Sequence, residues 1–239
     1  MENLNEQKQE VQNETAFLEA KLQRRSFLQF AGAGAAVVAL TAAGCRKDRV
    51  SAPITGTTLD FKDDFGVLNY AYALEQLEAA FYIKVASSMP SAFTTVQRNY
   101  FQDVQFHEIA HREFFKNALS TAAIGSLEVD FSSIDFTSAT AVLAAAQTFE
   151  DLGVAAYNGA GVRIKDDKFL VVAGQIVSVE ARHAAWVRDQ ISNGSFSDLP
   201  SLVPFGANVA GGLDGALSPD KVLALAKKYI KTTINVINL

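Results

Sequence analysis

The sequence contains very little cysteine. Cys45 is the single cysteine among 239 residues, so no disulfide can form within the chain. Iron–sulfur clusters and zinc sites that need several thiolates are excluded for the same reason. A metal site built within one chain must therefore take its ligands from the three histidines and from carboxylates.

The chain also lacks an excess of positive charge. It has 21 Lys and Arg against 26 Asp and Glu, a formal net charge of -5. Nucleic acid binding needs a broad positive face. We therefore expect no nucleic acid partner.

Proline is rare, and none of the five prolines falls inside four long stretches that have the composition of helices. Each stretch is closed by a cluster of turn-forming residues. We place these helices at about 63–87, 94–119, 138–164 and 167–192. Thr94 or Thr95 can cap the second helix, and Ser138 the third.

The connections between the four helices are short, long and short. The long one, 120–137, carries an apolar alternation that we expect to cross the bundle as an extended strip; its members are Val129, Phe131, Ile134 and Phe136. This order predicts an all-α four-helix bundle of two helical hairpins joined by one crossover.

Residues 194–239 are expected to form an extension that packs on the 61–193 bundle. The extension is loop-like until Ser218-Pro219-Asp220, which starts a short amphipathic helix through about Lys231. Its apolar side should lie against the bundle and comprises Val222, Leu223, Leu225, Ala226 and Ile230.

The N-terminal segment has the features of an export signal. Arg24-Arg25 precedes an apolar, Gly- and Ala-rich run that stops at Cys45, in the order Thr41-Ala42-Ala43-Gly44-Cys45. This resembles a twin-arginine signal over residues 1–44 joined to a lipoprotein box. The resemblance implies lipid attachment at Cys45, a tether over 45–60 and a place in the cell envelope, periplasmic or on the surface. An uncleaved transmembrane anchor is the alternative, and it also places the domain outside the cytoplasm.

Polar residues interrupt the buried stripe of every helix. Steps of three and four residues give Phe101, Val104, Glu108, His111 and Phe115 in the second helix, and Ala173, Ile176, Glu180, His183 and Val187 in the fourth. Each of these two helices thus places Glu-x-x-His on its core-facing line.

The first and third helices carry a second repeated pattern. Their stripes are Leu68, Ala71, Glu75, Glu78 and Tyr82, and Leu143, Ala146, Glu150, Gly153 and Tyr157. Seven residues correspond to ~10.5 Å of helical rise, so Glu75 shares a face with Tyr82, as Glu150 does with Tyr157. Glu78 is either a spare carboxylate ligand or a partially exposed end of the stripe.

Four inward carboxylates would each cost several kcal/mol to bury without partners. Two divalent cations would neutralise four glutamates, and each of two neutral imidazoles could bind one ion. The sequence therefore predicts a pair of metal ions inside the bundle. His107 lies about 100° round its helix from Glu108, so we expect it on the surface or in a crevice, and Trp186 in packing.

These patterns over residues 63–192 resemble the ferritin-like superfamily, with Glu-x6-Tyr most similar to its rubrerythrin branch and 74–82 to desiccation-related ferritin-like proteins. The resemblance implies two iron ions, or manganese, held by Glu75, Glu108, His111, Glu150, Glu180 and His183. It implies that Tyr82 and Tyr157 hydrogen-bond the carboxylates.

The resemblance also implies the oxidation of Fe(II) by oxygen or peroxide, in iron handling or oxidative-stress protection. The chain lacks the cysteines of a rubredoxin-like domain, so the electron donor would be external. The alternative is a non-catalytic envelope scaffold for stress or desiccation tolerance. We expect a small assembly, such as a homodimer, and no storage shell.

Overall fold

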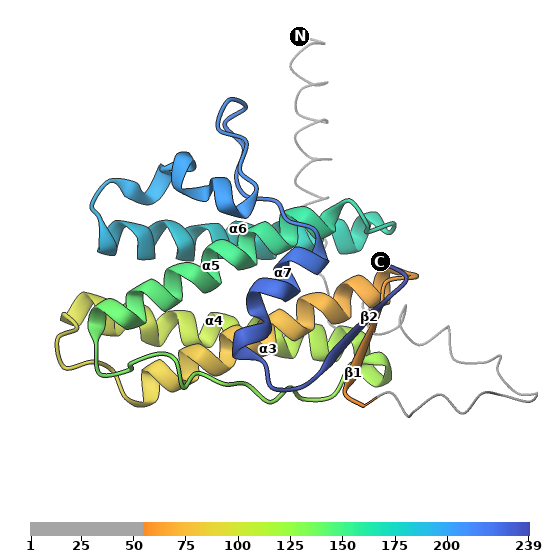
Figure 1. The fold of residues 1–239 in the computed structure, drawn as a ribbon, viewed down its shortest axis with the longest axis horizontal. Coiled ribbons are helices and arrows are strands. Elements are labelled where there is room, and N and C mark those ends of the chain that lie inside the picture. Colours follow the sequence, from red (N-terminus) through yellow and green to blue (C-terminus); the bar gives the residue numbers. More distant parts are fainter. Residues whose placement is uncertain (1–54) are drawn as a thin grey trace, which may run out of the picture. The chain divides into compact units, whose positions relative to one another are not determined.

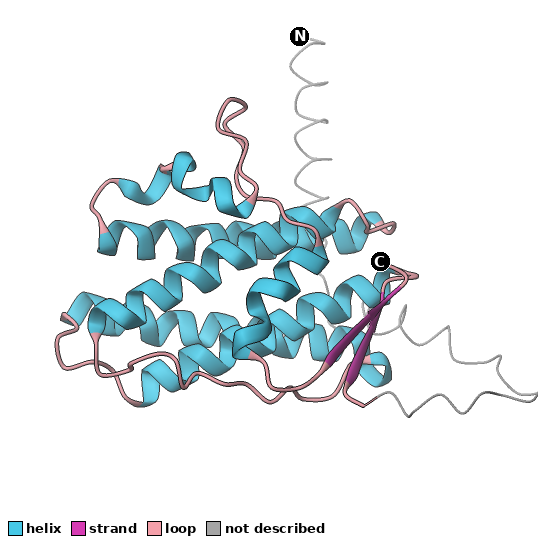
Figure 2. Cartoon of the chain, viewed as in Figure 1, coloured by secondary structure: helices cyan, strands magenta, loops and turns pink. Residues whose placement is uncertain are grey.

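The computed structural model describes residues 55–239, and its main feature is a bundle of four long helices (Figure 1, Figure 2). The helices are α3 (Asp64–Ser87), α4 (Thr95–Leu119), α5 (Ala139–Gly161) and α6 (Asp167–Ile191). The prediction of an all-α bundle is confirmed, and each helix lies within three residues of its expected bounds. The signal segment and Cys45 lie outside the described residues.

The bundle consists of two helical hairpins. Helix α3 packs along α4, and α5 packs along α6 (Figure 1). Side-chain caps begin all four helices, which explains why their starts could be recognised in the sequence; the capping residues are Asp63, Thr94, Ser138 and Asp166. Of the two candidate threonines, Thr94 is the cap, and with Gln97 it forms a capping box.

The long crossover lies across the bundle, as its apolar alternation predicted. Its apolar side chains are partly buried against the core. Phe131 and Phe136 both contact Phe81, with ring centroids 5.9 and 6.0 Å apart. Val129 forms an isolated bridge with Ile230, so the crossover also contacts the C-terminal extension.

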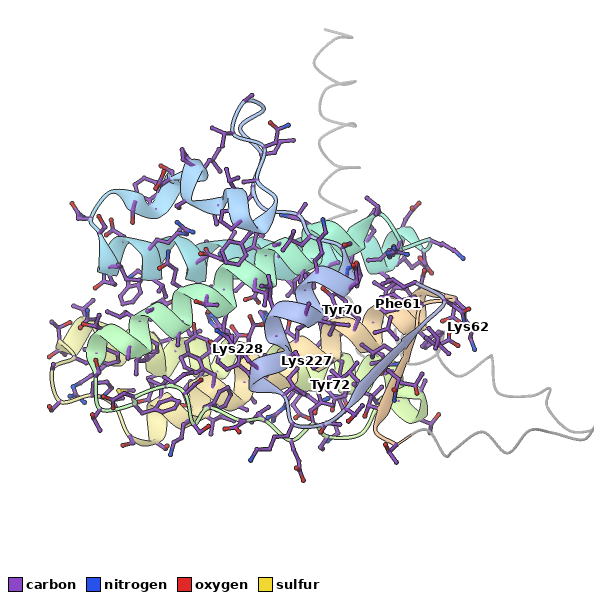
Figure 3. All side chains as sticks on the ribbon, in the orientation of Figure 1. Phe61, Lys62, Tyr70, Tyr72, Lys227 and Lys228 are labelled. Atoms are coloured by element: carbon purple, nitrogen blue, oxygen red, sulfur yellow. The ribbon has the colours of Figure 1, made fainter. Side chains whose placement is uncertain are left out.

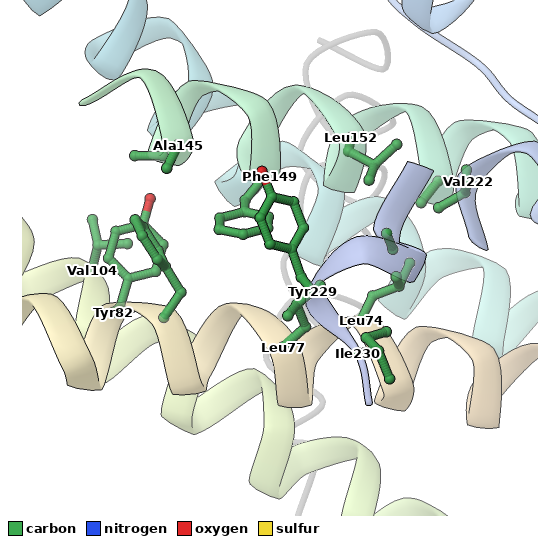
Figure 4. Packing of buried hydrophobic residues seen from close by; sticks show 14 of the residues in the cluster. Leu74, Leu77, Tyr82, Val104, Ala145, Phe149, Leu152, Val222, Tyr229 and Ile230 are labelled. Carbon is green, nitrogen blue, oxygen red and sulfur yellow. The ribbon is translucent and has the colours of Figure 1, made fainter. Parts of the chain in front are cut away.

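The C-terminal extension contains three 3₁₀ helices, η3 (Ser195–Ser197), η4 (Leu199–Phe205) and η5 (Lys227–Tyr229), and one α-helix, α7 (Pro219–Ala226). Val222 and Ala226 are fully buried, and Tyr229 packs on Phe149 with ring centroids 4.7 Å apart (Figure 4). The prediction that Leu225 faces the bundle is wrong, since it is 47% exposed. It lies about 100° round the helix from Ala226.

A two-stranded parallel pair joins the two ends of the described chain. Strand β1 (Thr57–Asp60) pairs with β2 (Ile234–Ile237), so residues expected in the tether belong to the fold. Leu59 of β1 is fully buried. Phe61 is the first residue after β1, and it packs on Tyr70 of α3 with ring centroids 5.7 Å apart (Figure 3).

Within residues 55–239, no helix is both long enough and apolar enough to cross a membrane.

The extension approaches α5 closely at Gly159. A Cβ there would lie 1.8 Å from the Leu217 carbonyl oxygen, beside the hydrogen bond from the Leu217 amide to the Ala155 carbonyl (3.0 Å). Gly159→Ala should therefore force the extension away from α5 and lower the free energy of unfolding by about 1–3 kcal/mol. Urea unfolding monitored by circular dichroism measures this change.

Gly174→Ala in α6 is the matched control. Apart from the adjacent backbone of α6, no atom of residues 55–239 lies within 4 Å of a Cβ placed there, so alanine should stabilise the helix by about 1 kcal/mol. Equal effects of the two substitutions would contradict the close approach at Gly159.

Candidate metal centre

The core of the bundle contains four fully buried glutamates, one from each long helix. Their exposed fraction is 0% in every case, and they are Glu75 of α3, Glu108 of α4, Glu150 of α5 and Glu180 of α6. His183 of α6 is 4% exposed, and the side chain of His111 of α4 is 14% exposed. The structure thus brings all six residues singled out from the helix stripes into the core.

These side chains form two overlapping groups of possible metal ligands. One group contains Glu75, Glu108, His111 and Glu180, and the other contains Glu108, Glu150, Glu180 and His183. Within each group the donor atoms all lie within 4.8 Å of one another. Glu108 and Glu180 belong to both groups.

The two shared glutamates each direct one oxygen to each histidine. Glu180 Oε1 lies 2.8 Å from His111 Nδ1, and Glu180 Oε2 lies 3.6 Å from His183 Nδ1. Glu108 Oε1 lies 3.1 Å from His183 Nδ1, and Glu108 Oε2 lies 3.7 Å from His111 Nδ1. A carboxylate with its oxygens divided in this way has the arrangement of a bridge between two ions.

The other two glutamates each face one histidine. Glu75 Oε2 lies 3.6 Å from His111 Nδ1, and Glu150 Oε2 lies 3.5 Å from His183 Nδ1. Each ring nitrogen therefore faces three carboxylates. The two groups are arranged alike around the shared pair.

The polar atoms that face one another in this cluster make no hydrogen bond among the described residues. They are Glu75 Oε2, both carboxylate oxygens of Glu108 and Glu180, Glu150 Oε2, and the Nδ1 atoms of His111 and His183. Buried polar atoms without a partner cost about 1–3 kcal/mol each. A cation among them would satisfy them together, so the donor set fits a pair of divalent ions.

A sequence family model described as a ferritin-like domain matches residues 63–193, which is more than half of the chain. This chain belongs to the ferritin-like domain family. No curated protein matches the chain in sequence. The matched residues contain all four long helices and both ligand groups.

Two tyrosines of the ferritin-like domain hold the outer oxygens of the unshared glutamates. Tyr82 of α3 donates a hydrogen bond to Glu150 Oε1 on α5, and Tyr157 of α5 donates one to Glu75 Oε1 on α3. Each tyrosine therefore bonds the glutamate of the opposite hairpin, although the sequence pattern pairs it with the glutamate of its own helix. Both tyrosines are buried, and Figure 4 shows Tyr82 among the packed core residues.

Glu78 lies beside the two groups but belongs to neither. It is 3% exposed, so the interpretation as a partially exposed end of the stripe is wrong. Its carboxyl occupies space that Gly153 leaves open, because a Cβ at Gly153 would lie 2.8 Å from Glu78 Oε1. Burial and the other glutamates raise the pKa of Glu78 well above its usual value.

Sequence reasoning missed a contact of His107. This histidine is exposed, as expected, but its Nδ1 lies 2.9 Å from Nε2 of His183. The signal was its position one residue before Glu108, on the side of α4 that turns toward α6. Trp186 does pack, as expected, because its ring stacks on Tyr100 with centroids 3.5 Å apart.

A buried ion pair beside the centre was also missed. Asp151 follows Glu150, and both of its oxygens accept hydrogen bonds from Arg188 of α6, at 2.8 and 2.6 Å. Arg188 also donates to Ser201 of η4. The pair therefore joins α5, α6 and the extension next to the cluster.

The histidines and glutamates of the centre shift the pKa values of one another. Burial would lower the pKa of His183, but Glu150 and Glu108 outweigh it and raise it to about 12. Burial would also lower the pKa of His111, but its carboxylate neighbours outweigh burial and raise this pKa well above its usual value. Burial raises the pKa of Glu75 and of Glu150 to about 8. Burial would also raise that of Glu180, but both histidines lower it to about 2.

These shifts predict how the stability of the metal-free protein depends on pH. On folding, the pKa values of Glu75 and Glu150 rise from 4.5 to about 8, and the pKa of His183 rises from 6.5 to about 12. A group whose pKa is higher in the folded than in the unfolded state stabilises the folded protein at pH values below its unfolded-state pKa. This stabilisation is lost as the pH rises through the folded-state pKa. Glu180 loses its contribution only as pH falls from 4.5 toward about 2. The metal-free protein should therefore unfold at a lower urea concentration when the pH is about 9 than when it is about 6.

Saturating Mn²⁺ should reverse this order, because metal ions displace the same protons and bind more tightly as pH rises. Urea unfolding with chelator and with Mn²⁺, at both pH values, measures the two trends. Identical pH dependence with and without the ion would contradict a role of the cluster in metal binding.

Proposed function

We propose that this ferritin-like domain binds two divalent metal ions, iron in the cell, and uses them for redox chemistry between Fe(II) and oxygen or peroxide. The observation that carries the proposal is the division of the Glu108 and Glu180 oxygens between His111 and His183. Glu108 and Glu180 would each hold both ions, and the two ions together would supply two-electron chemistry on a small oxidant.

Charge balance supports two ions. Four glutamate anions meet four positive charges from two divalent ions, while both imidazoles bind in their neutral form. The pair of ions thus replaces the protons that the metal-free cluster retains through its raised pKa values. Manganese suits the same oxygen-rich donors, so the metal assay includes it.

The tyrosines orient the unshared glutamates. Tyr157 binds Glu75 through Oε1 and leaves Oε2 for the centre, and Tyr82 leaves Oε2 of Glu150 for the centre. Hydrogen bonds of this kind keep a ligand carboxylate in place as the charge at the site changes. Both hydroxyls are buried, and burial raises the pKa of both tyrosines well above its usual value, so they remain hydrogen-bond donors.

Substitution of a shared glutamate tests the proposal. Glu108→Ala or Glu180→Ala removes donors from both groups, so each variant should bind fewer than two ions per chain and oxidise Fe(II) at least about tenfold more slowly. Metal analysis after anaerobic loading with Fe(II) or Mn²⁺, and the rate of Fe(II) oxidation with oxygen or peroxide, measure these losses.

Glu113→Ala is the matched control on α4. The Glu113 side chain is 42% exposed and pairs with Arg112 at 2.8 Å, so this change should leave metal content and oxidation rate unaltered. A wild-type protein that binds fewer than two ions and oxidises Fe(II) no faster than buffer would leave the non-catalytic scaffold as the function.

We also propose that the domain acts in the cell envelope, held by lipid on Cys45. The order of the paired arginines, the apolar run and the cysteine supports this proposal. Cys45→Ala should release the protein from the membrane fraction or block its processing. Mass spectrometry of the membrane-bound protein is the measurement, and retention of residues 1–44 in that fraction would refute lipid attachment at Cys45.

A further inference from the structure

The two histidines of the centre differ in what their outer ring nitrogens meet. Nδ1 of His183 faces the carboxylates of Glu108 and Glu150, at 3.1 and 3.5 Å. Its Nε2 faces away from them and lies 2.9 Å from Nδ1 of His107. The two ring planes are inclined by 16°, and ring N–H bonds and lone pairs lie in these planes. The arrangement therefore suits a hydrogen bond between the rings.

The direction of this hydrogen bond follows from the position of the carboxylates. A nitrogen that binds a metal ion must be free of its proton, and Nδ1 is the nitrogen of His183 that faces the donor group. The neutral ring then carries its proton on Nε2 and donates it to His107 Nδ1. The hydrogen bond at one ring nitrogen selects the tautomer that leaves the other nitrogen free.

We infer that His107 is a positioning residue that fixes the tautomer and ring orientation of His183, and thereby makes the ion position at His183 bind more tightly than the position at His111. This inference rests on the proposed two-ion function. Outer partners of metal-binding histidines typically change metal affinity by about 10–100-fold.

Further contacts hold His183 in place. The Tyr100 hydroxyl donates to the His183 carbonyl oxygen at 3.0 Å, and the Tyr100 ring lies perpendicular to that of His183. Trp186 of α6 stacks on Tyr100. A stacked pair of aromatic rings, one from α4 and one from α6, therefore lies beside His183.

Among the residues that the structure describes, none supports His111 as His107 supports His183. The residue before Glu180, which corresponds to His107 in the repeated pattern, is Val179, and its side chain cannot hydrogen-bond. No hydrogen bond from the described residues reaches the outer nitrogen of His111. The His111 side chain is also more exposed than that of His183, 14% against 5%.

Anaerobic titration of the full-length protein with Co²⁺ tests the inference. The wild-type chain should bind two Co²⁺ ions in two steps of unequal affinity. His107→Ala should weaken the tighter step about 10–100-fold and leave the weaker step unchanged. His107→Gln should retain most of the affinity, since its amide oxygen can accept from His183 Nε2. Val179→Ala is the matched control and should leave both steps as in the wild type.

Nuclear magnetic resonance of the Zn²⁺-loaded protein supplies a readout that a general structural role would not give. The Nε2 proton of His183 should exchange slowly with solvent in the wild type and in His107→Gln, and should exchange rapidly in His107→Ala. Circular dichroism should show the same fold in all variants, because His107 is exposed.

The outcomes separate this inference from the function on which it rests. The inference is overturned if the wild-type chain binds two ions and the Co²⁺ titration curve of His107→Ala superimposes on the wild-type curve. The proposed function then still stands. An unchanged Nε2 proton signal in His107→Ala also overturns the inference and leaves the proposed function standing. A wild-type chain that binds no Co²⁺ overturns both.

Discussion

The burial of four carboxylates in one small volume is the constraint on which the rest of this bundle depends. Each long helix contributes one of them, at 0% exposure, and charges in such a place cost several kcal/mol without compensation. The compensation comes from groups that the helices bring to the same level: two imidazoles and two tyrosine hydroxyls. The metal-free protein can balance the remaining charge by retaining protons, as the raised pKa values of Glu75 and Glu150 indicate. Two divalent ions would balance it with no proton retained.

The same constraint explains why the two hairpins repeat each other. A carboxylate that serves two ions needs one oxygen free on each side, and Glu108 and Glu180 have both oxygens free. A carboxylate that serves one ion can give its other oxygen to a structural hydrogen bond, as Glu75 and Glu150 do with the tyrosines. The tyrosines cross between the hairpins, so each hairpin orients a ligand of the other. The site therefore depends on how the two hairpins pack against each other.

Helices, caps and inward glutamates could be predicted because they depend on local spacing. A stripe of period three to four fixes which face of a helix is buried, and Thr94, Ser138 and Asp166 begin helices through bonds to residues two or three positions away. The features that could not be predicted depend on distant partners. Strand β1 is specified by β2, which lies more than 170 residues away. The pairing of Asp151 with Arg188 and the contact of His107 with His183 depend on how α4, α5 and α6 are placed side by side.

The departures from the repeat follow a physical rule. The hairpins agree at the ligand glutamates, the histidines and the two tyrosines, and they differ at positions that flank these residues. Glu78 corresponds to Gly153, and its carboxyl fits because that glycine has no side chain. His107 corresponds to Val179 and contacts His183 from the surface of α4. A change at a shared glutamate would alter the ligands of both ions together. A change at a flanking position alters one half while the common bridge is kept, so evenly repeated hairpins can produce two ion positions of unequal strength.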